Sequence, residues 1–135
     1  MSKSSHSEFG KLTKLVIKPS SHAFISEENV AREWQALNYL QKPDFALAIE
    51  EYEKFERMLK ATGVQLLHLP ENEELSIDSL YCRDASVSTD FGMIICRMGK
   101  EARSGEPLAQ KKFFADNEIT ILGEIVAPGT LEGGD

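Results

Sequence analysis

The feature that most constrains the fold is a helix-then-strand pattern that occurs twice along the chain. In the first copy, apolar residues recur at helical spacing over 44–62, Gly63 supplies a left-handed helix end, and a buried strand follows over 64–69. In the second copy, a helix is predicted over 106–116 and a strand over 119–126. The order of these segments predicts one compact α/β unit with a weak internal repeat.

The remaining elements are expected to be short. Four are predicted: a strand over 12–18, a helix over 27–40, and extended segments over 79–87 and 92–97. Ser26 is the predicted N-cap of the second of these, and a hairpin turn is expected over 89–92. Trp34 and the apolar stripe of the long helix, from Phe45 to Leu59, are expected to form core.

Composition bounds the class of protein. The chain has 135 residues, 41% of them hydrophobic and 27% charged, which is enough for one globular domain over 9–135 with a real core. Residues 1–8 are polar, lack the apolar centre of a secretory signal, and are expected to form a flexible leader. No apolar run is long enough to span a membrane, and two cysteines are too few for a disulfide framework, so a cytoplasmic location is expected.

Charge disfavours some ligands. The net charge of -7 and a pI near 5.0 argue against a nucleic-acid partner, because phosphate binding needs clustered Lys and Arg. An acidic chain is compatible with a cationic small-molecule substrate. The histidines His6, His22 and His68 are isolated, with no other ligand at metal-binding spacing, so no metal site is predicted.

Three motifs follow one another in the second half of the chain: DSLYCRD over 78–84, RMGKEARSGEP over 97–107 and GTLEGGD over 129–135. In this order they resemble the dimethylarginine dimethylaminohydrolases and the related arginine deiminases and amidinotransferases, which form the guanidine-modifying or pentein superfamily. The resemblance covers the whole chain. Each motif alone is weakly specific, and the three in register are more specific to the superfamily than to one of its activities.

The resemblance implies roles for four residues. Asp84 and Glu132 would bind and orient the substrate guanidinium, because a planar cation rich in N–H donors suits paired carboxylates. Holding it would also fix the central carbon for attack. Asp78 would lie near the substrate α-amino group and Arg103 near its α-carboxylate. Taken alone, without the joint pattern of the three motifs, Asp84 and Glu132 would be interpreted as ordinary turn and cap carboxylates.

Relatives in this superfamily attack the guanidinium carbon with a cysteine thiolate and use a histidine as general acid and base. Both residues normally lie beyond the equivalent of Asp135. The resemblance therefore implies the N-terminal portion of a five-bladed α/β propeller, about two of the repeats, which needs no cofactor and is inactive alone. The parent enzyme would hydrolyse a small cationic guanidino compound, such as dimethylarginine, to citrulline and an amine.

Alternatives remain open. Cys82, expected in mid-strand, and Cys96 are weak candidates for a nucleophile, so none is assigned within this chain. Arg83 resembles the arginine deiminases rather than the dimethylarginine hydrolases, which leaves a deiminase, and then an amidinotransferase, as other activities. The chain could also be a non-catalytic binding module. An open half-propeller would expose strand edges, which favours self-association or pairing with the missing half.

Overall fold

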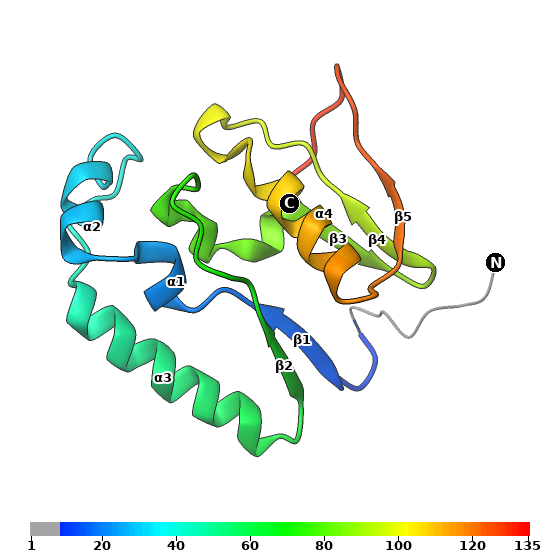
Figure 1. Ribbon diagram of the computed structural model, residues 1–135, viewed down its shortest axis with the longest axis horizontal. Helices are drawn as coiled ribbons and strands as arrows, with labels where there is room; N and C mark the ends of the chain where they lie inside the picture. The colour runs from blue at the N-terminus through cyan, green and yellow to red at the C-terminus, as the bar shows by residue number, and fades with distance from the viewer. Residues whose placement is uncertain (1–8) are drawn as a thin grey trace. The chain divides into compact units, whose positions relative to one another are not determined.

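The computed structural model describes residues 9–135, which form an α/β fold (Figure 1). The predicted leader over 1–8 lies outside the described residues. The elements are, in chain order, β1 (Lys14–Ile17), α1 (Ser20–Phe24), α2 (Glu27–Glu33), α3 (Phe45–Ala61), β2 (Gln65–His68), β3 (Ser86–Thr89), β4 (Gly92–Ile95), α4 (Glu106–Asp116) and β5 (Ile121–Glu124). Three short 3-10 turns join them: η1 (Ile77–Leu80), η2 (Cys82–Ala85) and η3 (Glu101–Arg103). The chain divides into two compact units, one of residues 12–80 and one containing 81–135.

The unit of residues 12–80 holds the first copy of the repeat. Strands β1 and β2 lie side by side and parallel, with Lys14 opposite Gln65, and α3 leads directly into β2 (Figure 1). The side chain of Asp44 caps α3 by accepting a hydrogen bond from the Leu47 N–H at 2.9 Å. At the other end, Gly63 has φ +83°, the left-handed value expected of a helix stop. The predicted strand, helix and strand of this copy are therefore confirmed.

The core of this unit is built by the two short helices and η1. Its fully buried members are Ala23, Phe24, Val30, Leu37 and Ile77, and Trp34 packs against them as expected. Ser26 caps α2 as predicted, accepting from the Asn29 N–H at 3.1 Å. The helix is shorter than the predicted 27–40: it ends at Glu33 with Trp34 as its C-cap, and the turn that follows reaches φ +65° at Asn38, which a helix cannot accommodate. Helix α1 was not predicted.

The apolar stripe of α3 is less buried than its pattern predicts. No residue of the helix is fully buried, and only Phe45 and Ala48, in its first turn, pack against the core cluster. Farther along, Phe55 and Met58 are 45% and 71% exposed. The expectation that the whole stripe forms core is wrong, because the core is supplied by α1, α2 and η1 and reaches only the beginning of α3.

The unit containing 81–135 holds the second copy. Strands β3 and β4 form the predicted hairpin, and β5 pairs with β4 in parallel after the crossover through α4, which packs on both (Figure 1). Gly92 has φ +140°, and a Cβ there would stand 2.8 Å from the Thr120 carbonyl oxygen, so the hairpin needs a glycine at this position.

The predicted extended segment over 79–87 is wrong for most of its length. Residues up to Ala85 form η1 and η2, and only 86–87 are extended. Tertiary hydrogen bonds explain the difference, because Arg103 Nη2 donates to the Tyr81 carbonyl at 3.0 Å and Gln110 Nε2 donates to the Cys82 carbonyl at 2.7 Å. Cys82 therefore lies in a turn, not in mid-strand. None of the helices within 9–135 is long and apolar enough to cross a membrane.

Candidate functional site

The continuation of β4 beyond Ile95 organises the candidate site. The Cys96 N–H donates to the Ala85 carbonyl at 3.0 Å, which ties the strand to the end of η2. One residue later, Arg97 forms an antiparallel bridge with Leu131, whose N–H donates to the Arg97 carbonyl at 2.9 Å. Because Glu132 follows Leu131, this bridge carries the GTLEGGD motif back to the segment that contains Asp84.

Gly133 and Gly134 pack directly against the Asp84 turn. The Gly133 N–H donates to the Asp84 carbonyl at 2.7 Å. A Cβ on Gly133 would stand 2.6 Å from the Arg83 carbonyl oxygen and 2.7 Å from that of Ser86, both fixed backbone atoms. A Cβ on Gly134 would overlap Asp84 Oδ1. The two glycines thus contact the backbone and the carboxylate of the turn.

Glu132 and Asp84 both lie near one thiol. Glu132 Oε1 accepts a hydrogen bond from the Gly99 N–H at 3.3 Å. Burial raises the pKa of the Cys96 thiol above its ordinary value, a hydrogen bond with the backbone of Gly133 lowers it, and the negative charges of Asp84 and Glu132 raise it further. The charges of both carboxylates therefore act on Cys96 and, together with its burial, favour the protonated thiol.

Arg103 holds Asp84 from the other side. Its Nη1 donates to Asp84 Oδ2 at 2.7 Å, while its Nε and Nη2 donate to the two carboxylate oxygens of Glu106, each at 2.8 Å. The side chains of Arg103 and Glu106 are only 7% and 3% exposed, against 23% for Asp84. Arg103 and Glu106 therefore form a buried bidentate ion pair, and one further hydrogen bond joins Arg103 to the more exposed Asp84.

Electrostatics keep this network charged. Burial alone would lower the pKa of Arg103, but hydrogen bonds and charge attraction from Glu106 and Asp84 outweigh it, so the pKa is raised above its ordinary value. Glu106 stands in the first turn of α4, where the helix favours a negative charge. The Arg103 guanidinium is therefore a fixed positive charge next to Asp84 Oδ2.

The structure brings together three of the four predicted site residues. Asp84, Glu132 and Arg103 belong to the unit containing 81–135 and converge as described, whereas Asp78 is buried in η1 of the other unit. Residue-by-residue reasoning missed Glu106. Its signal was its place as the first residue of the predicted helix over 106–116, directly before Pro107 and three residues after Arg103.

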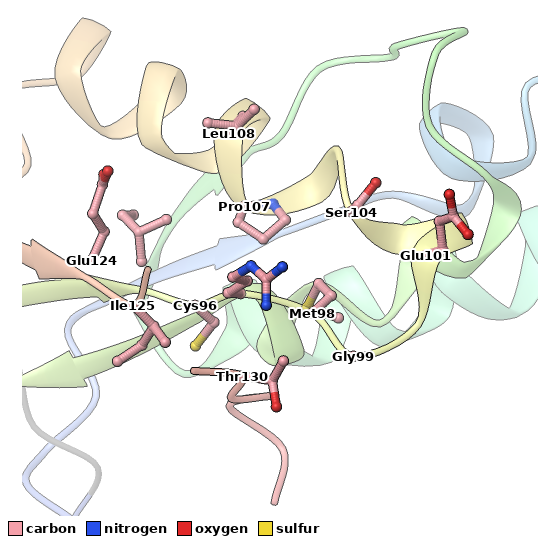
Figure 2. Close-up of a pocket in the computed structure, with 12 residues that line it drawn as sticks. Cys96, Met98, Gly99, Glu101, Ser104, Pro107, Leu108, Glu124, Ile125 and Thr130 are labelled. Carbon is pink, nitrogen blue, oxygen red and sulfur yellow. The ribbon is translucent and has the colours of Figure 1, made fainter. Parts of the chain in front are cut away.

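A cavity of about 500 Å³ lies next to this cluster (Figure 2). Pro107 and Leu108, at the start of α4, lie on one side of it, and Cys96, Ile125 and Thr130 lie on the other (Figure 2). Asp84 and Glu132 are not among the lining residues, but Cys96 and Gly99 are, and both contact or interact with Glu132. Within 9–135 no group of His, Cys, Asp and Glu side chains could hold a metal ion.

Comparison with known proteins identifies relatives of this chain by sequence and by fold. No family model matches the chain. Among curated proteins, the N(G),N(G)-dimethylarginine dimethylaminohydrolase of Pseudomonas aeruginosa is 34% identical over 98 residues, which is 73% of this chain and 38% of that protein. The chain thus spans well under half of the length of this relative.

Solved structures give the same answer. A cysteine-to-serine mutant of the Pseudomonas aeruginosa enzyme, complexed with citrulline, superposes with a TM-score of 0.73 at 26% identity, covering 93% of this chain and 46% of that one. An adduct of a histidine-to-glycine dimethylarginine dimethylaminohydrolase with S-methyl-L-thiocitrulline matches with the same values. The N-terminal domain of a cyanobacterial arginine dihydrolase shares the fold, with a TM-score of 0.71 at 18% identity over 91% of this chain and 43% of that one.

The sequence match and the fold agree with the resemblance carried by the three motifs. The chain belongs to the guanidine-modifying superfamily of the dimethylarginine dimethylaminohydrolases and their relatives, the penteins.

Proposed function

We propose that this chain is the substrate-holding part of a cysteine-dependent hydrolase that converts dimethylarginine, or a close analogue, to citrulline and an amine. The observation that carries the proposal is the packing of the segment that follows Glu132 on Asp84, with Gly133 bonded to the Asp84 carbonyl and Gly134 against its carboxylate, in a chain that is 34% identical over 98 residues to a dimethylarginine dimethylaminohydrolase. Two negative charges at one partly buried place create a site for a small organic cation. The substrate is a guanidino compound for the same reason.

The two carboxylates would act by orienting the substrate. A guanidinium held by Asp84 and Glu132 keeps its plane and its central carbon fixed, and hydrogen bonds to the anions stabilise its positive charge. A thiolate then adds to that carbon, the amine leaves with a proton from a general acid, and a covalent amidino thioether remains. Water, deprotonated by the same group, adds to the thioether, and the thiolate leaves as citrulline forms.

We further propose that the nucleophile is supplied from outside these 135 residues and that the chain alone does not turn substrate over. The chain has two cysteines. Cys96 is buried, and its burial together with the charges of Asp84 and Glu132 favours the neutral thiol, which is the wrong state for attack. Cys82 lies in η2, two residues before Asp84, and its carbonyl accepts a hydrogen bond from Gln110.

The proposal extends to the fold. Two units, each with a helix that leads into a strand of a parallel pair, are consistent with about two repeats of a five-bladed α/β propeller. A closed five-bladed propeller would require pairing with further repeats, and self-association is the alternative for an open edge. Cys82 and Cys96 form no disulfide, which fits a reducing compartment such as the cytoplasm.

Calorimetric titration of the chain with asymmetric dimethylarginine tests the proposal. Binding is expected for the wild type and should weaken at least about tenfold in Asp84→Asn or Glu132→Gln, because each change removes one charged hydrogen-bond acceptor. Glu50→Gln is the matched control, since it breaks an exposed pair with Lys54 on α3. Equal affinity in the wild type and Asp84→Asn would refute the assignment of the site.

Turnover is measured separately. Citrulline and dimethylamine should not accumulate when the isolated chain is incubated with dimethylarginine. Steady formation of citrulline that stops in Cys82→Ser or Cys96→Ser would show that the nucleophile lies within these residues, and the proposal of an external thiolate would be abandoned.

One observation favours a second activity. Arg83, exposed and adjacent to Asp84, resembles the arginine deiminases at this position. A deiminase part should bind arginine more tightly than dimethylarginine, and the complete enzyme would release ammonia instead of dimethylamine. An amidinotransferase would instead transfer the amidino group to an amine, and a non-catalytic module would bind its ligand without any product.

A further inference from the structure

Glu106 does not touch the proposed substrate position, yet it is the most deeply buried carboxylate of the site. We propose that Glu106 is a positioning residue, which locks Arg103 in one orientation so that Arg103 fixes the Asp84 carboxylate for a guanidinium ligand. The inference rests on the proposed function, because it gives Asp84 the role of guanidinium acceptor. It concerns how that acceptor is held in place.

The geometry forms a relay of three side chains. Glu106 binds the Nε and Nη2 edge of Arg103 with both oxygens at 2.8 Å, which leaves the Nη1 edge pointing at Asp84 Oδ2 at 2.7 Å. A planar guanidinium held at two points cannot rotate about its long axis. The direction of the Arg103–Asp84 bond is therefore set by Glu106.

Glu106 is itself anchored more firmly than either partner. It lies in the first turn of α4, directly before Pro107, and that helix packs on β4 and β5. Its 2% exposure contrasts with the exposed glutamates of the molecule. Asp84, by comparison, stands in a short 3-10 turn, so its carboxylate needs an external support to keep one rotamer.

The donors of Arg103 are nearly exhausted. Of its five N–H groups, two donate to Glu106, one to Asp84 and one to the Tyr81 carbonyl, so one N–H is left for a ligand. A substrate α-carboxylate could therefore gain at most a single bond from Arg103 without breaking the relay. The main task of Arg103 in this arrangement is to hold Asp84.

A role in positioning differs from a role in stability alone. If Glu106 acts through Asp84, its loss should weaken the binding of cationic guanidino ligands more than the binding of citrulline, whose ureido group carries no charge. A purely structural ion pair would weaken both ligands alike, through partial unfolding. The ratio of the two affinities therefore separates the two roles.

The test measures the affinities of dimethylarginine and citrulline in the wild type, Glu106→Gln and Glu50→Gln. Glu106→Gln keeps the side-chain shape but loses the charge, and the dimethylarginine affinity should fall about tenfold to a hundredfold, as expected when a reacting group is displaced by about 1 Å. The ratio of dimethylarginine to citrulline affinity should fall with it. Glu50→Gln should match the wild type in both.

A second variant guards against misfolding. The double change Arg103→Met with Glu106→Leu removes both buried charges, a replacement that often preserves stability. It should fold and should show the same loss of dimethylarginine affinity. Wild-type affinity in this double variant, or an unchanged affinity ratio in Glu106→Gln, would overturn the inference.

The proposed function is judged by a different variant. Asp84→Asn alone decides whether Asp84 binds the ligand. A loss of binding in Asp84→Asn together with wild-type binding in the Glu106 variants would refute the positioning role and leave the proposed function standing. Wild-type binding in Asp84→Asn would refute the proposed function itself.

Discussion

At the scale of single residues, the candidate site depends on two positions that have no side chain, Gly133 and Gly134. Gly133 and Gly134 follow Glu132 immediately, and both lie where a side chain would collide with the Asp84 turn. The collisions differ in kind. At Gly133 the obstacle is fixed backbone, whereas at Gly134 it is the movable end of the Asp84 side chain. The two glycines therefore make separable predictions.

Gly134→Ala should impair ligand binding with little loss of stability. The new Cβ would overlap Asp84 Oδ1, and rotation of that carboxylate relieves the clash while moving the proposed guanidinium acceptor. Calorimetric affinity for dimethylarginine and the melting midpoint measure the two effects. Gly123→Ala is the control, because a Cβ there meets nothing within 4 Å. A Gly134→Ala variant that binds normally would contradict the expected clash.

Gly133→Ala should instead destabilise the fold. Its Cβ would lie 2.6 and 2.7 Å from two carbonyl oxygens, and the backbone must shift to accept it. Overpacking of this kind costs about 1–3 kcal/mol. Denaturant unfolding followed by circular dichroism provides the measurement, again with Gly123→Ala as reference. Equal stability of the two variants would show that the GTLEGGD segment is not packed on the turn.

The thiol of Cys96 reports on both carboxylates. In a Cys82→Ser background, the rate of alkylation of Cys96 should reach half its maximum at a higher pH in the folded chain than in the urea-unfolded chain, where about 8.5 is ordinary. The raised pKa follows from burial and from the charges of Asp84 and Glu132. Asp84→Asn and Glu132→Gln should each move the midpoint back toward lower pH.

The same shift has a consequence for stability. Because the folded state keeps the Cys96 proton longer, its contribution is fully present below the unfolded pKa and is lost as pH rises through the folded value. Unfolding free energy should therefore decline above about pH 8.5 more in the wild type than in Cys96→Ala. A midpoint of alkylation equal in folded and unfolded chains would contradict both expectations.

At the scale of elements, hydrophobic period and capping residues predicted most of the regular structure. Asp44 and Gly63 mark the ends of α3, and Ser26 marks the start of α2, because each acts through bonds to its own neighbours. Sequence reasoning failed where distant groups decide. The turn η2 replaces part of an expected strand because the side chains of Arg103 and Gln110 bond to the Tyr81 and Cys82 carbonyls at its start.

The site divides along the same line. The three motifs implied roles for Asp84, Glu132 and Arg103. Glu106 lies inside the second motif without an implied role, because its importance comes from its burial and from its bonds to Arg103. The α3 stripe shows the opposite error. Its helical period was right, but period alone does not tell how far a core extends along a helix, and this one stops after Ala48.

The cap of α3 gives a test at this scale. Asp44→Ala should lower the free energy of unfolding by about 1 kcal/mol, because it removes the acceptor for the Leu47 N–H. Asp116→Asn, which breaks an exposed pair with Lys112 at the end of α4, should cost no more than about 0.5 kcal/mol. Urea unfolding measures both. A larger cost for the Asp116 variant would contradict the assignment of Asp44 as the cap.

At the scale of the whole molecule, the same strand-and-helix arrangement recurs in the two units with different outcomes. In the unit of residues 12–80 the short helices supply a core around Val30 and Ile77. In the unit containing 81–135 the buried side chains include an ion pair, Arg103 with Glu106. Buried charge is a weak source of stability, so an ion pair buried directly beside Asp84 fits a site that is held ready for a ligand.

This difference predicts a coupling between ligand and stability. A cation bound by Asp84 and Glu132 stabilises the folded state alone, by about 2.7 kcal/mol when the ligand is at a hundred times its dissociation constant. Dimethylarginine should therefore raise the melting midpoint by several degrees, and uncharged citrulline at equal concentration should raise it less, because the carboxylates gain no opposite charge. Thermal melts of the wild type and Asp84→Asn over a ligand series measure the effect. The shift should vanish in Asp84→Asn and persist in Glu50→Gln, and an identical shift in all three chains would mean that the cation binds elsewhere.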